Sequence, residues 1–496
     1  MEVLLEPPAT PLEYFVVAEL PEELPLDTVL VTRREVAGHG LVSFYGIVDE
    51  VEMGEYYMGR VRVLRIEPEI FVPPVPGAVV EVAEARTQEM AFRFNEMKRR
   101  MAAGRLRGGQ KAFLNLDFLN GQRGAHINIA GISGVATKTS YALFLLYSLF
   151  HSAPASRAII FNVKGDDLLY LHKPNARNNV IERSHYELLG LPYGPFPEVA
   201  YHQDSLWSLR EFAENEFVRY LFNDDDQTGS QTMAVEHLAV TLKELAAASP
   251  PEQLFLDGEA VTSLMQLSQA ICQSVDDAQS RWFDKAAAAT RFSIVRRLHS
   301  AAVQVNELLH AGGRPSFHYR SQLNVVDLHR LGDKARAFVV GAILKTLFEA
   351  RESQGDQHPT VYLVLDELNK YAPRHGSGPI KDMLLDVAER GRSLGVVLIG
   401  AEQNASQVEE RILSNASIRV VGRLEAEESN REAYGWLSGQ MRDRCALLQP
   451  GSMVVSQPDV PVPLMMTFPF PAWATRCSEV AEPRPKRGFK ASPEPA

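Results

Sequence analysis

An apolar run that ends in two carboxylates constrains this chain more than any other feature. Residues 361–365 read Val-Tyr-Leu-Val-Leu, and Asp366 and Glu367 follow directly. A strand buried on both faces of a parallel sheet is almost uniformly apolar, and its carboxyl end is where open α/β sheets bind ligands. Two acids at that end can hold the water shell of Mg²⁺ and activate an attacking water molecule. A strand that ends in a solvated acidic turn would look the same, so a second motif must decide.

Residues 125–145 supply this second motif, because they run from a short strand through a small-residue turn into an apolar helix. In a P-loop, such a turn aims backbone N–H groups at a phosphate, a lysine reaches the outer phosphate oxygens and a hydroxyl contacts Mg²⁺. Lys138 and Thr139 fit the last two roles. The match is imperfect, because Thr137 replaces the last glycine of the usual motif and Gly131 precedes Lys138 by seven residues instead of six.

The turn must therefore contain one extra residue or a rearranged backbone. Alone, this segment is slightly more typical of an ordinary glycine turn into a helix. Together with the acidic pair, it favours a nucleotide hydrolase that uses ATP and Mg²⁺. The residues that we predict to bind the nucleotide are Gly131, Gly134, Ala136, Thr137, Lys138, Thr139 and Ser140.

Composition indicates a globular protein of several domains. The chain has 496 residues, of which 45% are hydrophobic and 23% charged, and this length predicts two to four domains. No apolar stretch is long enough to span a bilayer, and the N-terminus lacks the basic start of a signal peptide, so we expect a cytoplasmic protein without a membrane segment. The three cysteines lie far apart and indicate neither a disulfide framework nor a zinc site.

The net charge of −11 argues against a broad basic surface for nucleic acid. Residues 98–111 nevertheless contain six lysines and arginines and no acid, so one local basic stripe is available. A solvated helix face or a linker is the other interpretation of this run.

Alternating strand and helix patterns predict an α/β fold with a mainly parallel, doubly wound sheet. Residues 157–167 are predicted to form another buried strand with a polar end, and we expect Asp166 and Asp167 at that end either to face the catalytic edge or to form an acidic loop. The domains that we predict are a small β-barrel at 1–85, the first part of the nucleotide domain at 86–203 with a helix and connector over 86–112, a helical insertion at 204–312, the second part at 313–470, and a tail at 471–496.

Four segments resemble the HerA branch of the HerA/FtsK ATPases, and their order and spacing make the resemblance specific. They are residues 363–373, 388–395, 398–403 and 413–423. In that family a HAS β-barrel precedes a RecA-like motor with a helical insertion. The resemblance implies a homohexameric, ATP-driven translocase or helicase on double-stranded DNA. It also implies a partner such as the NurA nuclease in DNA end processing and repair, or another effector in antiphage defence.

The resemblance also assigns roles to individual residues. Lys138 would hold phosphate, and Thr139 and Asp366 would hold Mg²⁺, Asp366 either directly or through water. Glu367 would act as the catalytic carboxylate and Gln403 as a polar sensor of the terminal phosphate.

Two arginines at 390 and 392 are candidates for a finger that reaches the nucleotide of a neighbouring subunit. Arg392, in the Gly-Arg-x-x-Gly segment, resembles the family's arginine finger, and Arg390 is the nearby substitute. Stabilisation of transition-state charge across an interface would make hydrolysis depend on assembly. The loop at 376–381, with Lys381, is a candidate contact to DNA. A nucleotide-gated ring that docks a nuclease or effector and translocates little is the alternative function.

Overall fold

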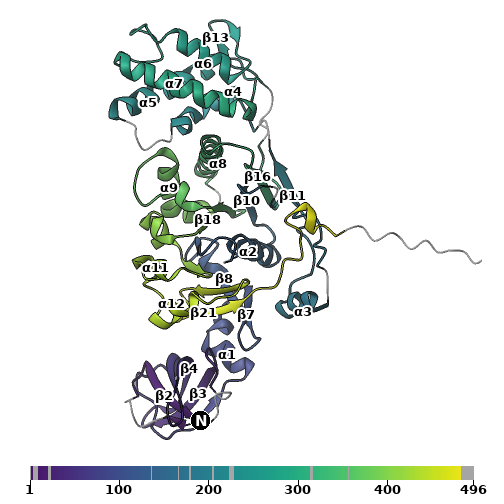
Figure 1. The fold of residues 1–496 in the computed structure, drawn as a ribbon, viewed down its shortest axis with the longest axis vertical. Coiled ribbons are helices and arrows are strands. Elements are labelled where there is room, and N and C mark those ends of the chain that lie inside the picture. The colour runs from purple at the N-terminus through teal and green to yellow at the C-terminus, as the bar shows by residue number, and fades with distance from the viewer. Residues whose placement is uncertain are drawn as a thin grey trace, which may run out of the picture.

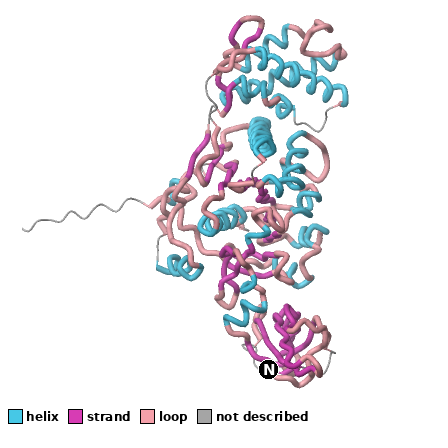
Figure 2. Tube along the Cα trace, turned by 180° about the vertical axis from the view of Figure 1, so that it is seen from behind, coloured by secondary structure: helices cyan, strands magenta, loops and turns pink. Residues whose placement is uncertain are grey.

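The structure is a computed structural model that describes residues 2–3, 9–19, 24–135, 137–165, 167–177, 180–203, 206–222, 228–312, 317–355 and 357–481. Figure 1 shows an elongated molecule in three tiers. An N-terminal sheet lies at one end, a large α/β domain lies in the middle, and a helical lobe lies at the other end. The view from behind shows the strands of the N-terminal tier at the end opposite the helical lobe (Figure 2).

The described residues of the middle tier form an 11-stranded sheet. Its first seven strands are parallel to their neighbours, which confirms the mainly parallel sheet, and the last four are antiparallel. In spatial order they are β11 (Val199–His202), β16 (Leu323–Asp327), β10 (Arg157–Asn162), β17 (Val361–Asp366), β18 (Val396–Glu402), β9 (Ile127–Ala130), β19 (Ile418–Val421), β20 (Ser452–Ser456), β21 (Leu464–Thr467), β7 (Arg100–Leu106) and β8 (Lys111–Asn115).

Helices cover both faces of this sheet, which explains its uniformly apolar central strands. Alternate residues of β17 pack into two separate cores: Leu363 lies with the residues of α8 (Asp333–Gln354) and α9 (Pro379–Leu394), and Val364 lies with those of α2 (Lys138–Ser152). Because β18 lies between β9 and β17, the turn after β9 and the acids after β17 face each other across the end of β18. The remaining helices of this tier are α3 (Val180–Leu189), α10 (Glu410–Asn415), α11 (Ala426–Ser429) and α12 (Gly439–Cys445).

The N-terminal tier is an antiparallel sheet within residues 1–85, the segment for which a small β-barrel is predicted. Its order is β1-β2-β5-β4-β3-β6, and β1 and β6 form the two ends of this order. The strands are β1 (Glu2–Val3), β2 (Glu13–Ala18), β3 (Val29–Val36), β4 (Gly40–Met53), β5 (Tyr57–Glu67) and β6 (Val80–Val82).

The helix and connector predicted over 86–112 are wrong in their second half. A short helix, α1 (Ala85–Ala91), is followed by the hairpin β7–β8, and β7 pairs with β21 from the far end of the chain. Helix-forming residues such as Ala, Met and Arg gave the local signal, and pairing with a distant strand overrides it. The basic run lies at and around this hairpin, where Arg99 pairs with Asp117 at 2.8 Å and Arg100 with Glu89 at 3.5 Å.

The predicted insertion is helical, apart from two pairs of two-residue strands, and lies beyond α8 (Figure 1). Its helices are α4 (Leu209–Glu214), α5 (Gly229–Ala248), α6 (Leu264–Gln273) and α7 (Ala288–Val305), and its strands are β12 (Trp207–Ser208), β13 (Phe255–Leu256), β14 (Glu259–Ala260) and β15 (Leu309–His310). Within the described part of the chain, none of the helices combines the length and apolarity needed to cross a membrane.

Gly341 tests how tightly the insertion packs against the sheet domain. A Cβ at this position of α8 would lie 2.4 Å from Cδ1 of Tyr220, so we expect Gly341→Ala to destabilise the protein by about 1–3 kcal/mol. The matched control is Gly229→Ala at the start of α5, where a Cβ would meet nothing within 4 Å. Thermal unfolding should show a lower midpoint for Gly341→Ala and no loss for Gly229→Ala. Equal midpoints would contradict this packing.

Candidate active site

The turn between β9 and α2 is anchored at its start by the two neighbouring strands. The Gly131 N–H donates to the Glu402 carbonyl at 3.1 Å, and the Ile132 N–H donates to the Arg423 carbonyl at 2.8 Å. Gly134 has a φ of +81°, a conformation that glycine adopts at little cost. The turn therefore leaves the end of β9 in a fixed direction and delivers the chain to the first turn of α2.

Thr137, the residue that replaces the usual glycine, keeps the backbone conformation that a glycine would supply. Its φ is +48° and its ψ is 34°, in the left-handed region. For a residue other than glycine this costs on the order of 1 kcal/mol. The Thr137 hydroxyl accepts a hydrogen bond from the Gly451 N–H at 3.2 Å, which holds the residue in place from the far part of the chain. The glycine-poor turn is therefore supported by tertiary contacts.

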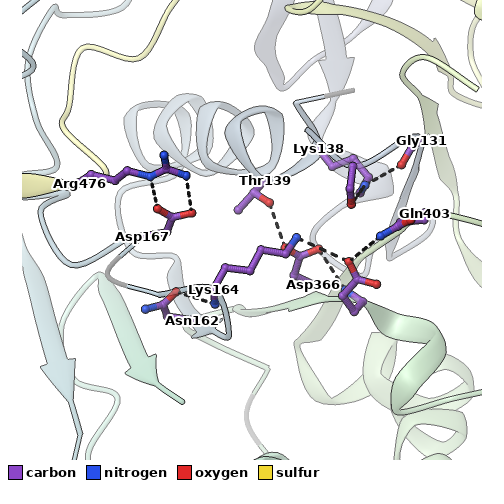
Figure 3. A network of polar contacts seen from close by, with 11 residues as sticks. Gly131, Lys138, Thr139, Asn162, Lys164, Asp167, Asp366, Gln403 and Arg476 are labelled. Carbon is purple, nitrogen blue, oxygen red and sulfur yellow. Dashed lines mark hydrogen bonds and ion pairs between the residues drawn. The ribbon is translucent and has the colours of Figure 1, made fainter. Parts of the chain in front are cut away.

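Lys138 is the first residue of α2, and its side chain folds back into the turn. Its Nζ donates to the Gly131 carbonyl at 2.6 Å and lies 3.4 Å from the Ser133 hydroxyl (Figure 3). Burial lowers the pKa of the Lys138 ammonium below its ordinary value, and the nearby Asp366 carboxylate partly offsets this effect. The turn thus surrounds a buried cation, which is the arrangement that a phosphate site requires.

Asp366, Glu367 and Thr139 meet at the carboxyl ends of the strands. The Thr139 hydroxyl donates to Asp366 Oδ2 at 3.1 Å, across 227 residues of sequence. Glu367 follows in the left-handed region with a φ of +60°, and its N–H donates to Asp366 Oδ1 at 3.1 Å. This sharp turn lets two successive carboxylates face the same edge. The structure therefore brings Thr139, Asp366 and Glu367 together.

Lys164, which the sequence reasoning did not select, supplies the cation between the two acids. It follows β10, and its Nζ lies 2.7 Å from Asp366 Oδ2 and 3.6 Å from Glu367 Oε1. Burial is the largest single influence on Lys164 and opposes its charged form, but the interactions with Asp366 and Glu367 together outweigh it, and the pKa is raised above its ordinary value. The available signal was the polar end of the segment predicted as a strand at 157–167, which contains Lys164 as well as the two acids.

Glu402 places a third carboxyl group behind the site, fully buried at the end of β18. Its Oε1 accepts a hydrogen bond from Asn128 Nδ2 at 2.7 Å, and its Oε2 has no partner among the described residues. Burial raises the pKa of Glu402 well above its ordinary value, and the hydrogen bond from Asn128 only partly offsets this. The negative charges of Asp366 and Glu367 act in the same direction and also raise the pKa of Glu402.

A cavity of about 370 Å³ lies beside these residues. This volume is in the range of small-ligand sites. Lys138, Thr139, Lys164 and Asp366 line it together with Ser133, Gly134, Thr137 and Ser140, and a segment near the C-terminus contributes Thr475, Arg476 and Glu479. Asp167 also lines the cavity, where Arg476 pairs with it (Figure 3).

Comparison with solved structures shows the fold to which this site belongs. The bacterial conjugative coupling protein TrwBdeltaN70 matches with a TM-score of 0.52 and 12% identity, over 81% of this chain and 95% of that chain. The plasmid coupling protein TrwB in complex with ADP and Mg²⁺ matches with a TM-score of 0.50 and 12% identity, over 79% and 95%. VirB4 of Thermoanaerobacter pseudethanolicus is 15% identical over 75% and 96%, with a TM-score of 0.49.

The chain has a RecA-like P-loop ATPase fold. No protein-family model matches the sequence, and no curated protein matches it. Within the P-loop, Ala136 lies outside the described residues, and so does Asp166 in the loop after β10.

The remaining predicted residues lie farther from the P-loop. Gln403 is exposed, and its Nε2 lies 3.5 Å from Glu367 Oε1. Arg392 donates to the carbonyls of Gly121 and Gln122 at 3.0 and 2.7 Å, while Arg390 pairs with Glu352. These contacts lie away from the described part of the P-loop, and the role of both arginines at a neighbouring subunit stays a prediction.

The proposed DNA contact of Lys381 is wrong for this conformation. Its side chain is buried, and its Nζ lies 2.7 Å from Glu409 Oε2 and 3.0 Å from the Gly376 carbonyl. The ammonium therefore closes its own loop instead of facing solvent.

The buried Glu402 generates a test of stability against pH. Because the pKa of Glu402 is raised in the folded protein, its contribution to the free energy of unfolding is complete below the ordinary carboxyl pKa. That contribution is lost as the pH rises toward the raised pKa. Glutamine stays neutral, so the unfolding free energy of Glu402→Gln relative to wild type should increase as the pH rises from the ordinary carboxyl pKa toward the raised one. The increase should be up to about 1.4 kcal/mol per pH unit.

Glu409→Gln is the control of opposite sign, because the hydrogen bond from Lys381 lowers the pKa of Glu409. Ionised Glu409 stabilises the protein at neutral pH, and this stabilisation is lost in acid. Glu409→Gln should therefore be less stable than wild type at pH 7 and approach the stability of wild type at low pH. Denaturant unfolding at several pH values measures both. Parallel pH profiles for wild type and Glu402→Gln would contradict a neutral buried carboxyl group.

Proposed function

We propose that this protein is an ATP hydrolase that uses Mg²⁺ and drives movement along double-stranded DNA, as a homohexamer of the HerA type. The observation that carries the proposal is the convergence of Lys138, Thr139, Asp366 and Glu367 at one sheet edge, with Thr139 and Asp366 in contact at 3.1 Å. A phosphate site, a hydroxyl and two carboxylates at the carboxyl ends of parallel strands are the parts that nucleotide hydrolysis needs.

The residues fit a magnesium ion. Adjacent ligands in an octahedron with Mg²⁺–oxygen distances of 2.0–2.1 Å are about 2.9 Å apart, close to the 3.1 Å between Thr139 Oγ1 and Asp366 Oδ2. Thr139 would hold the ion directly and Asp366 directly or through water. When bound, Mg²⁺ neutralises negative charge on the phosphates.

Phosphate binding, proton acceptance and positioning are carried out by residues of the chain itself. Lys138 and the backbone of the P-loop bind and orient the phosphates, and Glu367 accepts a proton from the attacking water. Gln403 keeps Glu367 in position and senses the terminal phosphate. Lys164 balances the two carboxylates before nucleotide binds and is placed to meet a phosphate afterwards.

Two observations support DNA as the track. The chain resembles HerA in four motifs, and the TrwB structures with the same fold are described as conjugative and plasmid coupling proteins. We further propose that Arg392, with Arg390 as substitute, completes the site of an adjacent subunit in the hexamer. A NurA-like nuclease in DNA end processing, or an effector in antiphage defence, is the partner class that the HerA resemblance favours.

Steady-state ATP hydrolysis with and without linear duplex DNA tests the proposal. We expect DNA to stimulate turnover, Lys138→Ala to abolish it, and Glu367→Gln to reduce it by about 100-fold or more, because a general base contributes that much. Glu427→Gln, whose side chain is 85% exposed on a distant helix, should keep wild-type turnover. Ring assembly of each variant is confirmed by sedimentation.

Two results would count against this function. Assembled wild-type rings that never turn over Mg-ATP would exclude a hydrolase. Turnover that depends on Lys138 and Glu367 but ignores DNA would exclude the motor and favour the nucleotide-gated scaffold.

A further inference from the structure

A segment close to the C-terminus, residues 468–481, crosses the nucleotide cavity, and we name it the C-terminal strap. It leaves the sheet after β21 and runs past α2 toward the loops that follow β10, as Figure 1 shows in yellow. Three of its residues, Thr475, Arg476 and Glu479, line the cavity beside the P-loop. The P-loop and the strap are more than 300 residues apart in sequence, and both border one cavity.

The strap is fixed on both sides of its cavity-lining residues. Trp473 is fully buried, with its ring centroid 4.9 Å from that of Tyr147 in α2 and 4.8 Å from that of Phe196. On the other side, beyond Glu479, the Ala481 N–H donates to the Pro174 carbonyl at 3.0 Å. These contacts hold the backbone of the strap, so the side chain of Arg476 is the part that can turn.

Arg476 points into the cavity and is paired there with Asp167. Its Nε and Nη2 both donate to the Asp167 carboxylate, and the Nη2 contact is 3.1 Å long (Figure 3). Guanidinium groups form the same bidentate geometry with phosphate. In the same view, Thr139 and Lys164 lie between this pair and Lys138. The pair therefore faces the end of the cavity where Asp366 and Lys164 meet.

The Arg476–Asp167 pair is weak enough to exchange. The two side chains are 59% and 28% exposed, and ion pairs of this kind contribute little because water screens them. A triphosphate carries several negative charges, which attract the guanidinium and repel the Asp167 carboxylate. Exchange of Asp167 for a phosphate partner costs little and replaces a screened pair by a stronger, charge-assisted one.

We propose that Arg476 binds the outermost phosphate of the nucleotide from within the same chain, and that Asp167 is its resting partner and competitor. This inference rests on the proposed function and adds a positioning residue to it. The phosphates would then be bound from two sides of the cavity, by Lys138 in the P-loop and by Arg476 in the strap.

Equilibrium binding of a fluorescent, non-hydrolysable ATP analogue with Mg²⁺, without DNA, tests the exchange. We expect Arg476→Ala to weaken binding about tenfold, since a charge-assisted contact is worth roughly one factor of ten. The corresponding ADP analogue should be affected less, by under about threefold, and Arg476→Lys should restore part of the affinity. Asp167→Asn should bind as tightly as wild type or up to about threefold more tightly, because the competitor is gone.

Two further variants separate the possible failures. Arg431→Ala removes an exposed arginine that pairs with Glu427 at 2.9 Å away from the cavity, and it should bind like wild type. If Lys138→Ala loses binding but Arg476→Ala does not, Arg476 is not a phosphate contact. If Asp167→Asn weakens binding as much as Arg476→Ala, the ion pair only stabilises the strap, and the proposed exchange of Asp167 for a phosphate is wrong. If Lys138→Ala binds like wild type, the proposed function fails, and the role of Arg476 fails with it.

Discussion

The crowding of charges at one edge of the sheet is the constraint on which the rest of this molecule depends. Parallel strands β9, β10, β17 and β18 all end there, so Asp366 and Glu367 lie near Lys138 and Lys164, with Glu402 behind them. Burial makes each charge costly unless it is balanced. The Lys164–Asp366 pair, the raised pKa of Glu402 and the hydrogen bond from Lys138 to the Gly131 carbonyl supply that balance. A bound phosphate with its cation would extend it.

Much of the central fold could be predicted, because its signals are local. The buried run at 361–366 and the turn before α2 carry their periodicity and turn residues in a few positions each, and both appear where expected. The hairpin β7–β8 could not be predicted, since β7 gains its place by pairing with β21 at the other end of the chain. Local composition contains no information about such a partner.

The residues of the site also fall into those that the sequence predicts and those that it does not. Lys138, Thr139, Asp366 and Glu367 belong to motifs, and the structure brings them together. The left-handed Thr137 depends on the Gly451 N–H, 314 residues away, so the sequence could show the missing glycine but not what replaces it. Arg476 could not be predicted, because no motif near it in sequence indicates a nucleotide site. Only the path of the strap places it beside the P-loop. The strap thus links the far end of the chain to the P-loop.

If this charged edge binds a nucleotide together with a divalent cation, calorimetric titration of the wild-type protein with ADP, in the presence and in the absence of Mg²⁺, will show it. We expect saturable binding of one nucleotide per chain that is stronger with Mg²⁺, because Thr139 and Asp366 would hold the cation and the phosphates would share it. Absence of binding, or an affinity that is the same without Mg²⁺, would contradict it.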